Sequence, residues 1–263
     1  MTALLIFGLG YSAGAIARRI EARGWTVTGT TRDGRNGSIP FADEAAVLAA
    51  MRSATHVLSS VPPDASGRDP VLANYGEALA LAPARWVGYL SSTGVYGDTG
   101  GAWVDESAPL KGRRAGRNAA DLAWQGLRAD VRIFRLPGIY GPGRSALDRV
   151  REGKAHRVDL PDQIFSRIHV DDIVGAVVAS IDSPATGVFN IADDLPASQN
   201  DVVEAAASML GLAPPPYVTI DSLSPMARAF YAENRRVANG RAKRLLGWSP
   251  RFAEYRSGLN SCL

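Results

Sequence analysis

The chain has 263 residues, of which 46% are hydrophobic and 21% charged, and its formal net charge at pH 7 is +3. This composition excludes a disordered or collagen-like chain and is typical of a globular protein with one or two domains. The basic residues are scattered and are not interleaved with aromatic residues, which argues against nucleic-acid binding.

The few cysteine and histidine residues limit the disulfides and metal sites that the chain can form. The one cysteine, Cys262, cannot form a disulfide within the chain, which suits a reducing compartment. The histidines, at positions 56, 156 and 169, include no pair with metal-ligand spacing, so we expect no metal. The N-terminal apolar run lacks a basic leader and a cleavage site and is too short to span a bilayer, so we expect a cytoplasmic protein.

Strands and helices alternate along most of the chain. The apolar run Ala3–Phe7 predicts a buried parallel strand, and apolar residues at helical spacing predict a helix over 13–23. The same patterns predict further strands at 26–30, 38–41, 55–61, 85–90, 131–136, 165–170 and 188–192, and further helices at 44–52, 70–81, 115–128, 146–151 and 171–180. This alternation predicts an α/β fold, a Rossmann-type doubly wound parallel sheet with helices on both faces.

Beyond residue 136 the alternation loosens, and short helices are separated by Pro-rich stretches. We therefore predict two domains. The dinucleotide-binding Rossmann domain covers 1–140, with its sheet completed by about 165–192. A smaller substrate-binding lobe is formed by 141–164 and 193–263, and we expect it to lie over the carboxyl edge of the sheet, where ligands bind in such folds.

The turn after the first strand, GLGYSAG at 8–14, fits the pattern G-x-G-x-x-A through Gly8, Gly10 and Ala13. Glycines allow a tight turn and let backbone N–H groups approach a pyrophosphate, which the N-terminus of the following helix favours. Because that helix begins here, we also expect Tyr11 and Ser12 to contact the cofactor. The turn therefore predicts a dinucleotide site.

The end of the second strand indicates which dinucleotide binds. An acidic residue at this point would bind the ribose 2′-hydroxyl of NAD, but the chain has Thr30, Thr31 and Arg32. A planar cation and two hydroxyl donors suit a 2′-phosphate, so we predict NADP. Asp33, one residue later, leaves NAD open.

The glycine turn at 8–14, SSTGVYG at 91–97 and RLPGIYGPG at 135–143 together resemble segments of the extended short-chain dehydrogenase/reductases, the NAD(P)-dependent epimerase/dehydratase superfamily. The resemblance covers nearly the whole chain, including WVDESAPL at 103–110 and RIHVDD at 167–172. The first turn departs from the family pattern, because these enzymes usually carry G-x-x-G-x-x-G and the turn of this chain is one residue shorter. The resemblance implies an oxidoreductase or epimerase/dehydratase-like enzyme and is compatible with a homodimer. The cofactor contacts that it implies beyond the turn are Val61, Pro62, Ser91 and, near the nicotinamide carboxamide, Pro137.

In that family a Ser or Thr binds the substrate oxygen, and a Tyr-x-x-x-Lys pair on the next helix handles the proton and the ribose. Ser92 corresponds to the hydroxyl residue, but the chain contains no Tyr-x-x-x-Lys. Matching Asp121 to an acidic residue of the family's helix puts Arg113 at the Tyr position and Arg117 at the Lys position. Arginine stays protonated, so Arg113 cannot cycle a proton, whereas Arg117 could still place positive charge near the ribose. The chain is thus an atypical example of the resemblance.

Three other residues are candidates for the missing acid, namely Tyr96, Tyr140 and His169. For each of them, packing or a structural hydrogen bond is the commoner role. His169 and Asp171 in particular are expected to order the join between strand and helix, with Asp171 as the N-cap.

Arginines indicate the charge of the substrate. Several of them lie in segments that we expect to converge above the carboxyl edge of the sheet, and together with Thr93 they suit an anionic substrate group. These arginines are Arg135, Arg144 and Arg167, and the resemblance implies a further late arginine, Arg235, in the same role. Alternatively, they pair with acidic residues such as Asp148, Asp171 and Glu233. The aromatic residues that either wall the pocket or pack in the core are Trp103, Phe230 and Tyr231.

Two functions remain open at this point. The first is an NADP-dependent enzyme that acts on a small or nucleotide-linked, anionic substrate, and the glycine turn, Ser92 and the arginines indicate it. The second is a non-catalytic NADP(H)-binding sensor or regulatory protein, which the missing Tyr and Lys indicate. Neither reading requires a nucleic-acid or membrane partner.

Overall fold

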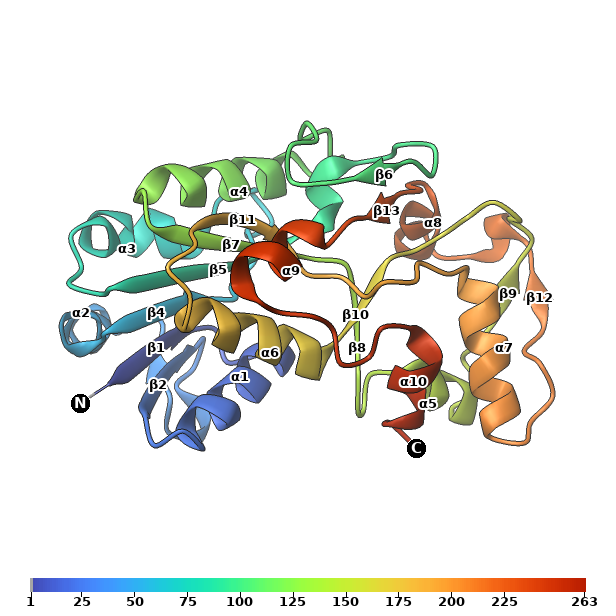
Figure 1. The fold of residues 1–263 in the computed structure, drawn as a ribbon, viewed down its shortest axis with the longest axis horizontal. Coiled ribbons are helices and arrows are strands. Elements are labelled where there is room, and N and C mark those ends of the chain that lie inside the picture. The colour runs from blue at the N-terminus through green and yellow to red at the C-terminus, as the bar shows by residue number, and fades with distance from the viewer. Residues whose placement is uncertain (1) are drawn as a thin grey trace.

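A seven-stranded parallel sheet forms the centre of the protein (Figure 1). The structure is a computed structural model and describes residues 2–263. From one edge the strands follow the order β3-β2-β1-β4-β5-β7-β11, and each neighbouring pair is parallel. The chain reverses its direction of growth between β1 and β4, which is where doubly wound folds form a ligand crevice. The bounds are β1 (Ala3–Phe7), β2 (Thr26–Thr31), β3 (Ile39–Pro40), β4 (His56–Ser59), β5 (Trp86–Ser92), β7 (Val131–Leu136) and β11 (Gly187–Asn190).

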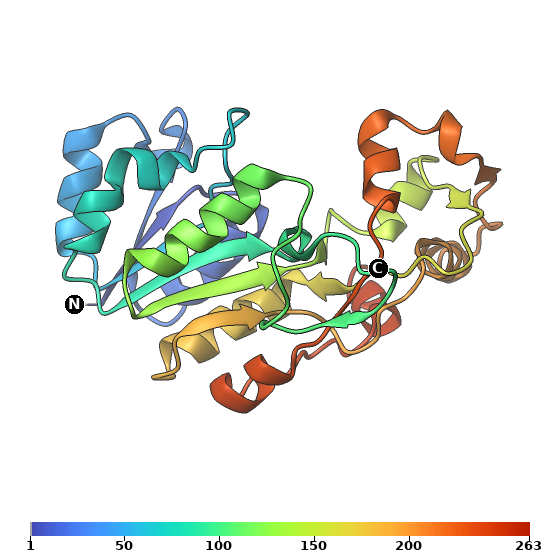
Figure 2. The ribbon, with the colours of Figure 1, turned by 90° about the horizontal axis from the view of Figure 1, so that it is seen from above.

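Helices cover both faces of the sheet, as Figure 2 shows. On one face α2, α3 and α4 pack against the strands, and on the other α1, α6 and α9 do so. Each helix turns an apolar stripe toward the sheet, so the two faces have separate cores that hold the strands between them. The bounds are α1 (Tyr11–Glu21), α2 (Glu44–Ser53), α3 (Pro70–Ala80), α4 (Ala115–Leu127), α6 (Val170–Ile181) and α9 (Gly240–Leu246).

A smaller lobe lies beyond the carboxyl ends of the strands, on the right of Figures 1 and 2. Apolar residues of its helices form its core, among them Leu147, Val203 and Leu259, together with Tyr140. A short parallel pair, β9 with β12, belongs to the same lobe. Its elements are α5 (Ala146–Arg151), β9 (Arg157–Val158), α7 (Gln199–Met209), β12 (Tyr217–Val218), η3 (Ile220–Ser222), α8 (Pro225–Tyr231) and α10 (Tyr255–Asn260).

Two further parallel pairs lie between the sheet domain and the lobe. One pairs β8 (Gly138–Tyr140) with β10 (Arg167–His169), and the other pairs β6 (Trp103–Val104) with β13 (Arg236–Val237). The strand predicted at 165–170 is therefore shorter than expected and lies outside the central sheet. Its partner β8 is separated from β7 by Pro137, which has no N–H to continue a ladder.

The remaining helical turns are η1 (Arg35–Gly37), after β2, and η2 (Thr93–Tyr96), after β5. Helix α6 begins one residue earlier than predicted, and the expectation that Asp171 is its N-cap is wrong. The N-cap is His169, whose Nδ1 accepts a hydrogen bond of 3.2 Å from the Asp171 backbone N–H. Asp171 instead lies in the first turn, where a carboxylate is favourable to the helix dipole. Within residues 2–263, no helix is both long and apolar enough to cross a membrane.

Candidate functional site

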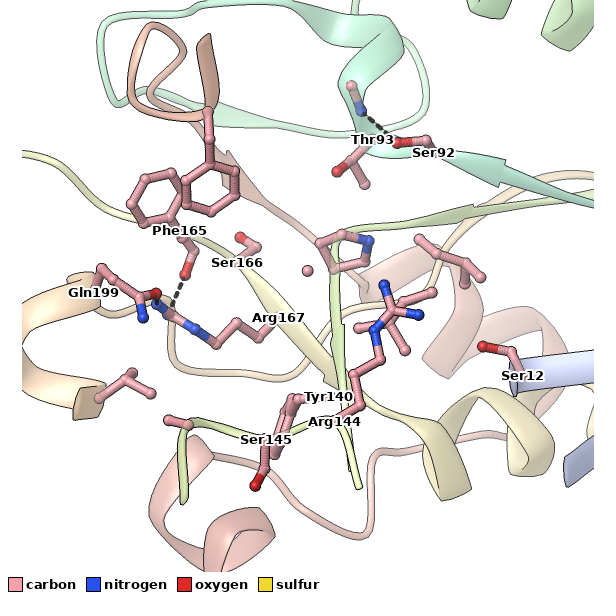
Figure 3. Close-up of a pocket in the computed structure, with 18 of the residues that line it drawn as sticks. Ser12, Ser92, Thr93, Tyr140, Arg144, Ser145, Phe165, Ser166, Arg167 and Gln199 are labelled. Carbon is pink, nitrogen blue, oxygen red and sulfur yellow. Dashed lines mark hydrogen bonds between the residues drawn. The ribbon is translucent and has the colours of Figure 1, made fainter. Parts of the chain in front are cut away.

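A large cleft follows the carboxyl edge of the sheet and continues under the lobe (Figure 3). Its volume is about 1140 Å³, which is large enough for a dinucleotide and a second ligand. One side is formed by the turns that follow β1, β4, β5 and β7, and the other by α5, α7, α8 and the segments beside them. We call these the cofactor side and the substrate side.

The turn after β1 has the geometry that glycine alone allows. Gly8 has a φ of +83°, and a Cβ at this position would lie 2.8 Å from Cγ2 of Val61. Hydrogen bonds hold the turn from two neighbouring strands: Thr30 Oγ1 accepts from the Gly8 N–H at 3.2 Å, and Ser60 Oγ donates to the Gly8 carbonyl at 2.6 Å. Gly8, Thr30 and Val61 therefore shape the turn and do not themselves border the cleft.

The N-terminus of α1 opens onto the cleft. Its N-cap is Gly10, which offers no side-chain acceptor, and a Cβ on Gly10 would meet nothing within 4 Å. Among residues 2–263, no acceptor bonds the backbone N–H groups of Tyr11, Ser12 and Ala13. All four residues border the cleft. Donors left open at the positive end of a helix form an anion site, as the sequence predicts for a pyrophosphate.

The end of β2 lies beside the cofactor side and outside the cleft wall. The hydroxyl of Thr31 is buried and bonds Asp33 Oδ1 at 3.2 Å and Ser38 Oγ at 2.7 Å. Backbone hydrogen bonds lower the pKa of Asp33, so this carboxyl is ionised at neutral pH. Arg32 is exposed, and its guanidinium makes no hydrogen bond or ion pair with any of residues 2–263. The predicted role of this cation, to bind a 2′-phosphate, stays a prediction.

The hydroxyl residues after β5 have different environments. Ser92 borders the cleft, and its Oγ accepts a hydrogen bond of 3.1 Å from the Gly94 N–H, which leaves its own hydrogen available to a ligand. Thr93 also borders the cleft (Figure 3). Ser91 borders it too, but its Oγ donates to Asp121 Oδ2 at 2.5 Å and so points into the protein. Pro62, Arg117 and Pro137 complete this part of the cofactor side.

A buried ionic network lies directly behind these hydroxyl residues. Asp121 accepts from Arg135 through both carboxylate oxygens, at 3.1 and 2.7 Å, and the side chains of the pair are 0% and 3% exposed. Arg135 also donates to the hydroxyl of Tyr96 at 3.0 Å, and that hydroxyl donates to Asn190 Oδ1 at 2.7 Å. Arg135 and Tyr96 are therefore enclosed within the protein. Neither borders the cleft, so Tyr96 has the structural hydrogen-bonding role given above as the commoner one, and Arg135 pairs with a carboxylate, as the alternative for the arginines allowed.

Arg113, the residue at the position of the family's Tyr, forms an ion pair with Glu233 of the lobe. Arg113 Nε donates to Glu233 Oε1 at 2.8 Å, and its Nη2 donates to the Ala229 carbonyl at 2.7 Å. Arg235 Nη1 donates to Glu233 Oε2 at 2.7 Å and to the Gly97 carbonyl at 2.9 Å. Although burial raises it, the hydrogen bonds from Arg235 and Arg113 hold the pKa of Glu233 below its ordinary value. Arg235 thus pairs with Glu233, the alternative that the sequence left open.

Arg117, at the predicted Lys position, is half-buried and borders the cleft. Burial lowers its pKa, and the structure gives it no ion pair with any carboxylate of residues 2–263. Positive charge is therefore present at this point of the cofactor side.

The two other predicted substrate arginines differ in what they contact. Arg167 is buried and donates to the carbonyls of Phe165 and Ala197 at 2.9 and 2.8 Å and to Gln199 Oε1 at 3.1 Å. Burial lowers its pKa to about 10. Arg144 is exposed, lies 5.6 Å from the Tyr11 ring centroid and extends into the cleft (Figure 3). Its guanidinium has no carboxylate partner among residues 2–263.

Packing encloses the last two candidates for the missing acid, Tyr140 and His169. Tyr140 is in the cleft wall but only 7% exposed, and burial raises the pKa of its hydroxyl, which makes no hydrogen bond within residues 2–263. A Cβ on Gly258 would overlap that hydroxyl, so it faces α10. His169 is fully buried, acts as the N-cap described above and does not border the cleft. His169 therefore orders the join between β10 and α6, as expected from the sequence.

Sequence reasoning missed several residues of the substrate side, chiefly Phe165, Gln199 and the bridging role of Glu233. No motif marks them, because they reach the cleft through the packing of the lobe. Of the predicted aromatic residues, Phe230 and Tyr231 border the cleft, whereas Trp103 is exposed elsewhere. Residues 2–263 contain no group of three or more His, Cys, Asp or Glu side chains placed to hold a metal ion.

Comparison with known proteins identifies the class. No family model matches the chain. A Streptomyces sp protein named 3-diazoavenalumate denitrifying reductase is 31% identical over 290 residues, which cover 91% of this chain and 93% of the relative. A solved structure of a functionally unknown conserved protein from Silicibacter pomeroyi DSS is 42% identical, with a TM-score of 0.90, and covers 100% of this chain and 98% of that one. The chain belongs to the NAD(P)-dependent epimerase/dehydratase family of extended short-chain dehydrogenase/reductases.

Two solved structures of lower identity share the Rossmann-type fold. The human epimerase family protein SDR39U1 with NADPH is 19% identical, with a TM-score of 0.78 over 99% of both chains. MoeE5 in complex with UDP-glucuronic acid and NAD is 21% identical, with a TM-score of 0.79 over 98% of this chain and 97% of that one.

Proposed function

We propose that the protein binds a nicotinamide dinucleotide, with NADP preferred to NAD, and acts as a reductase on a small or nucleotide-linked, anionic substrate. The observation that carries this proposal is one continuous cleft that joins the uncapped N-terminus of α1 to the hydroxyl of Ser92. Support comes from the relative named as a reductase and from the similar folds solved with NADPH and with NAD.

The residues present fit such a cofactor. The open N–H groups at the start of α1 suit a pyrophosphate, and the gap above Gly10 leaves room for one. The unpaired cation of Arg32 suits a 2′-phosphate at the end of β2. Ser91, Arg117, Pro62 and Pro137 surround the other end, where the ribose and nicotinamide would lie.

When bound in its reduced form, the cofactor would supply a hydride. Ser92 can then donate a hydrogen bond to the acceptor atom of the substrate, because its oxygen is already held by Gly94. Arg113 keeps its protons and is bound to Glu233, so it supplies no proton to the reaction. Ser92 is thus the side chain to which we assign the contact with the reacting group.

The cofactor proposal is tested by fluorescence titration with NADPH and, separately, NADH. We expect tighter binding of NADPH. Arg32→Ala should raise the Kd for NADPH about tenfold or more and leave that for NADH within about twofold, because only NADPH carries the 2′-phosphate. Arg35→Ala, which removes a nearby exposed arginine, is the control and should change neither. Binding of neither nucleotide would contradict the proposal.

A second function is favoured by one observation, the engagement of Arg113 with Glu233 where the family carries its acid. In that case the protein binds NADP(H) as a sensor and transfers no hydride. Turnover of NADPH with a panel of carbonyl compounds and sugar nucleotides separates the two functions. Loss of turnover in Ser92→Ala supports the reductase. A wild-type protein that binds NADPH, oxidises none of it and captures another protein only when NADPH is present would support the sensor.

A further inference from the structure

Arg144 lies at the end of a tight turn whose backbone is held on both sides. The turn joins β8 to α5 and reads Gly-Pro-Gly-Arg, and the Arg144 N–H donates to the Gly141 carbonyl at 3.0 Å. Gly143 has a φ of +71°, the conformation that the third position of a type II turn requires. Ser145 follows as the N-cap of α5, in a capping box with Asp148. The backbone of Arg144 is therefore fixed, while its exposed side chain extends into the cleft (Figure 3).

The same turn is bonded to the first residue of α1. The Tyr11 hydroxyl donates to the Pro142 carbonyl at 3.0 Å, and the Arg144 guanidinium lies over the Tyr11 ring, with its Cζ 5.6 Å from the ring centroid. A Cβ on Gly141 would lie 2.6 Å from the Tyr11 hydroxyl, so the turn passes close to this side chain. A cation of the lobe is thereby placed beside the residue that begins α1, where the open N–H groups form the anion site.

The acidic residue nearest to Arg144 in the sequence is engaged elsewhere. Asp148 Oδ2 accepts from the Ser145 N–H and from its hydroxyl, each at 2.7 Å, and Asp148 Oδ1 lies 3.6 Å from Arg151 Nη1. Within residues 2–263, no carboxylate oxygen lies within 4 Å of the Arg144 guanidinium. An unpaired guanidinium suits phosphate oxygens, which it can bind through two parallel hydrogen bonds.

The other unpaired arginines of the cleft are placed differently. Arg114, Arg117 and Arg149 also border it without a carboxylate partner in the described part of the chain. Arg114 and Arg117 belong to the start of α4, and Arg149 belongs to α5, where its Nη2 donates to the Lys154 carbonyl at 3.3 Å. No hydrogen bond or cation–π contact among residues 2–263 connects any of the three to α1. Position therefore selects Arg144 for an anion at the start of that helix.

We propose that Arg144, which the sequence assigned to the substrate, binds the pyrophosphate of the cofactor and that Tyr11 positions its guanidinium. This inference rests on the proposed function, which supplies the cofactor at the N-terminus of α1. It adds a contact from the other side of the cleft. The pyrophosphate is held between backbone N–H groups of the sheet domain and a side chain of the lobe, so cofactor binding links the two parts of the protein.

The test compares fragments of the cofactor by their displacement of NADPH, followed by NADPH fluorescence. 2′-Phospho-ADP-ribose carries the pyrophosphate, whereas 2′-AMP carries the 2′-phosphate alone. Arg144→Gln should raise the Kd for NADPH and for 2′-phospho-ADP-ribose about tenfold and leave that for 2′-AMP within about twofold. Arg32→Ala removes the cation proposed for the 2′-phosphate and should weaken binding of all three nucleotides.

Three further variants assign the contact. Arg149→Gln is the matched control, because it removes another exposed arginine that borders the cleft, and it should leave the Kd for 2′-phospho-ADP-ribose within about twofold. Arg144→Lys keeps the charge but not the planar fork and should raise that Kd about threefold. Tyr11→Phe removes the hydroxyl that holds the Pro142 carbonyl and should raise it about threefold in the wild-type background. In the Arg144→Gln background, Tyr11→Phe should have almost no effect, because the side chain that it positions is then absent.

Three results would overturn the inference. The first is an unchanged Kd for 2′-phospho-ADP-ribose in Arg144→Gln. The second is an equal loss in Arg149→Gln, which would assign the effect to the net charge of the cleft. The third is an equal loss of 2′-AMP binding in Arg144→Gln. In each case the wild-type protein still binds NADPH, so the proposed function stands, whereas failure of the wild-type protein to bind NADPH would remove the proposed function itself.

Discussion

The two sides of the cleft present binding groups of different kinds. On the cofactor side, backbone N–H groups at the start of α1 and short hydroxyl side chains after β5 face the cleft, and strands of the central sheet position them. On the substrate side, long charged side chains border the cleft and several are engaged with one another, as in Arg113–Glu233–Arg235. The comparison teaches that, on the proposed function, the backbone would supply much of cofactor recognition, whereas substrate recognition would depend on which side chains the lobe leaves unpaired.

The same contrast separates two arginine–carboxylate networks. Asp121 and Arg135 are enclosed, with side chains 0% and 3% exposed, and support the end of β5 from behind. Glu233 and Arg113 are 11% and 46% exposed and connect the segment before α4 to the lobe. Chemically similar pairs are thus enclosed behind the cofactor side and accessible to solvent on the substrate side.

The largest effect is expected from breaking the enclosed network. Asp121→Ala should lower the free energy of unfolding by about 3–5 kcal/mol, because it leaves the Arg135 guanidinium buried without its carboxylate. Urea denaturation measures this. Asp182→Ala, which removes the partner of Arg23 in an exposed pair, is the control and should cost less than about 1 kcal/mol. Equal losses in the two variants would show that enclosure does not distinguish these pairs.

A negative charge placed at the start of α1 should weaken cofactor binding without lowering the free energy of unfolding. Gly10→Asp meets open space and supplies an N-cap carboxylate, so we expect the free energy of unfolding to be unchanged or to rise by up to about 0.5 kcal/mol. The same carboxylate occupies the open N–H groups and repels a pyrophosphate, so the Kd for NADPH should rise on the order of 100-fold. Titration and denaturation of one preparation measure both quantities.

Gly10→Asn is the matched variant, since it caps the helix without charge. It should weaken NADPH binding less than Gly10→Asp does. If both variants bind NADPH like the wild type, the anion site is not at this helix.

The smallest effect is expected on the substrate side. Glu233→Gln removes the carboxylate that occupies Arg113 and Arg235, so binding of UDP-glucose to the NADP⁺-saturated protein should strengthen about threefold to tenfold. The Kd for NADPH should not change. Glu152→Gln neutralises an exposed glutamate that also borders the cleft, and calorimetry should show no gain for this control. A similar gain in both variants would mean that net charge, and not the release of the two arginines, controls binding.

Much of the sheet domain follows from local sequence. The apolar runs and the glycine turn predict β1 at its observed bounds, β2 within one residue and α1 within two residues at each end, because each element buries apolar side chains and the turn needs a positive φ at Gly8. The strand at 165–170 is predicted less well. Its pairing with β8 outside the sheet depends on where the chain leaves β7.

Site prediction divides in the same way. Of the predicted residues, Gly10 to Ala13 of the turn, Ser92 and Pro137 border the cleft, because each follows the carboxyl end of a strand of the central sheet. The arginines could not be sorted from sequence. Arg135, Arg167 and Arg144 have the same side chain, and only their neighbours make the first an enclosed support, the second a link to carbonyl groups and the third an unpaired cation.

The sequence by itself determined the parallel α/β fold and the nucleotide turn, because both depend on short-range periodicity and on backbone freedom at glycine. The tertiary structure alone decided which charges are paired and which aromatic ring stays exposed to the cleft. Those outcomes depend on contacts such as Arg113 with Glu233 and Phe165 with Phe230, whose partners are far apart in the chain. Their geometry exists only when the lobe has packed against the sheet domain.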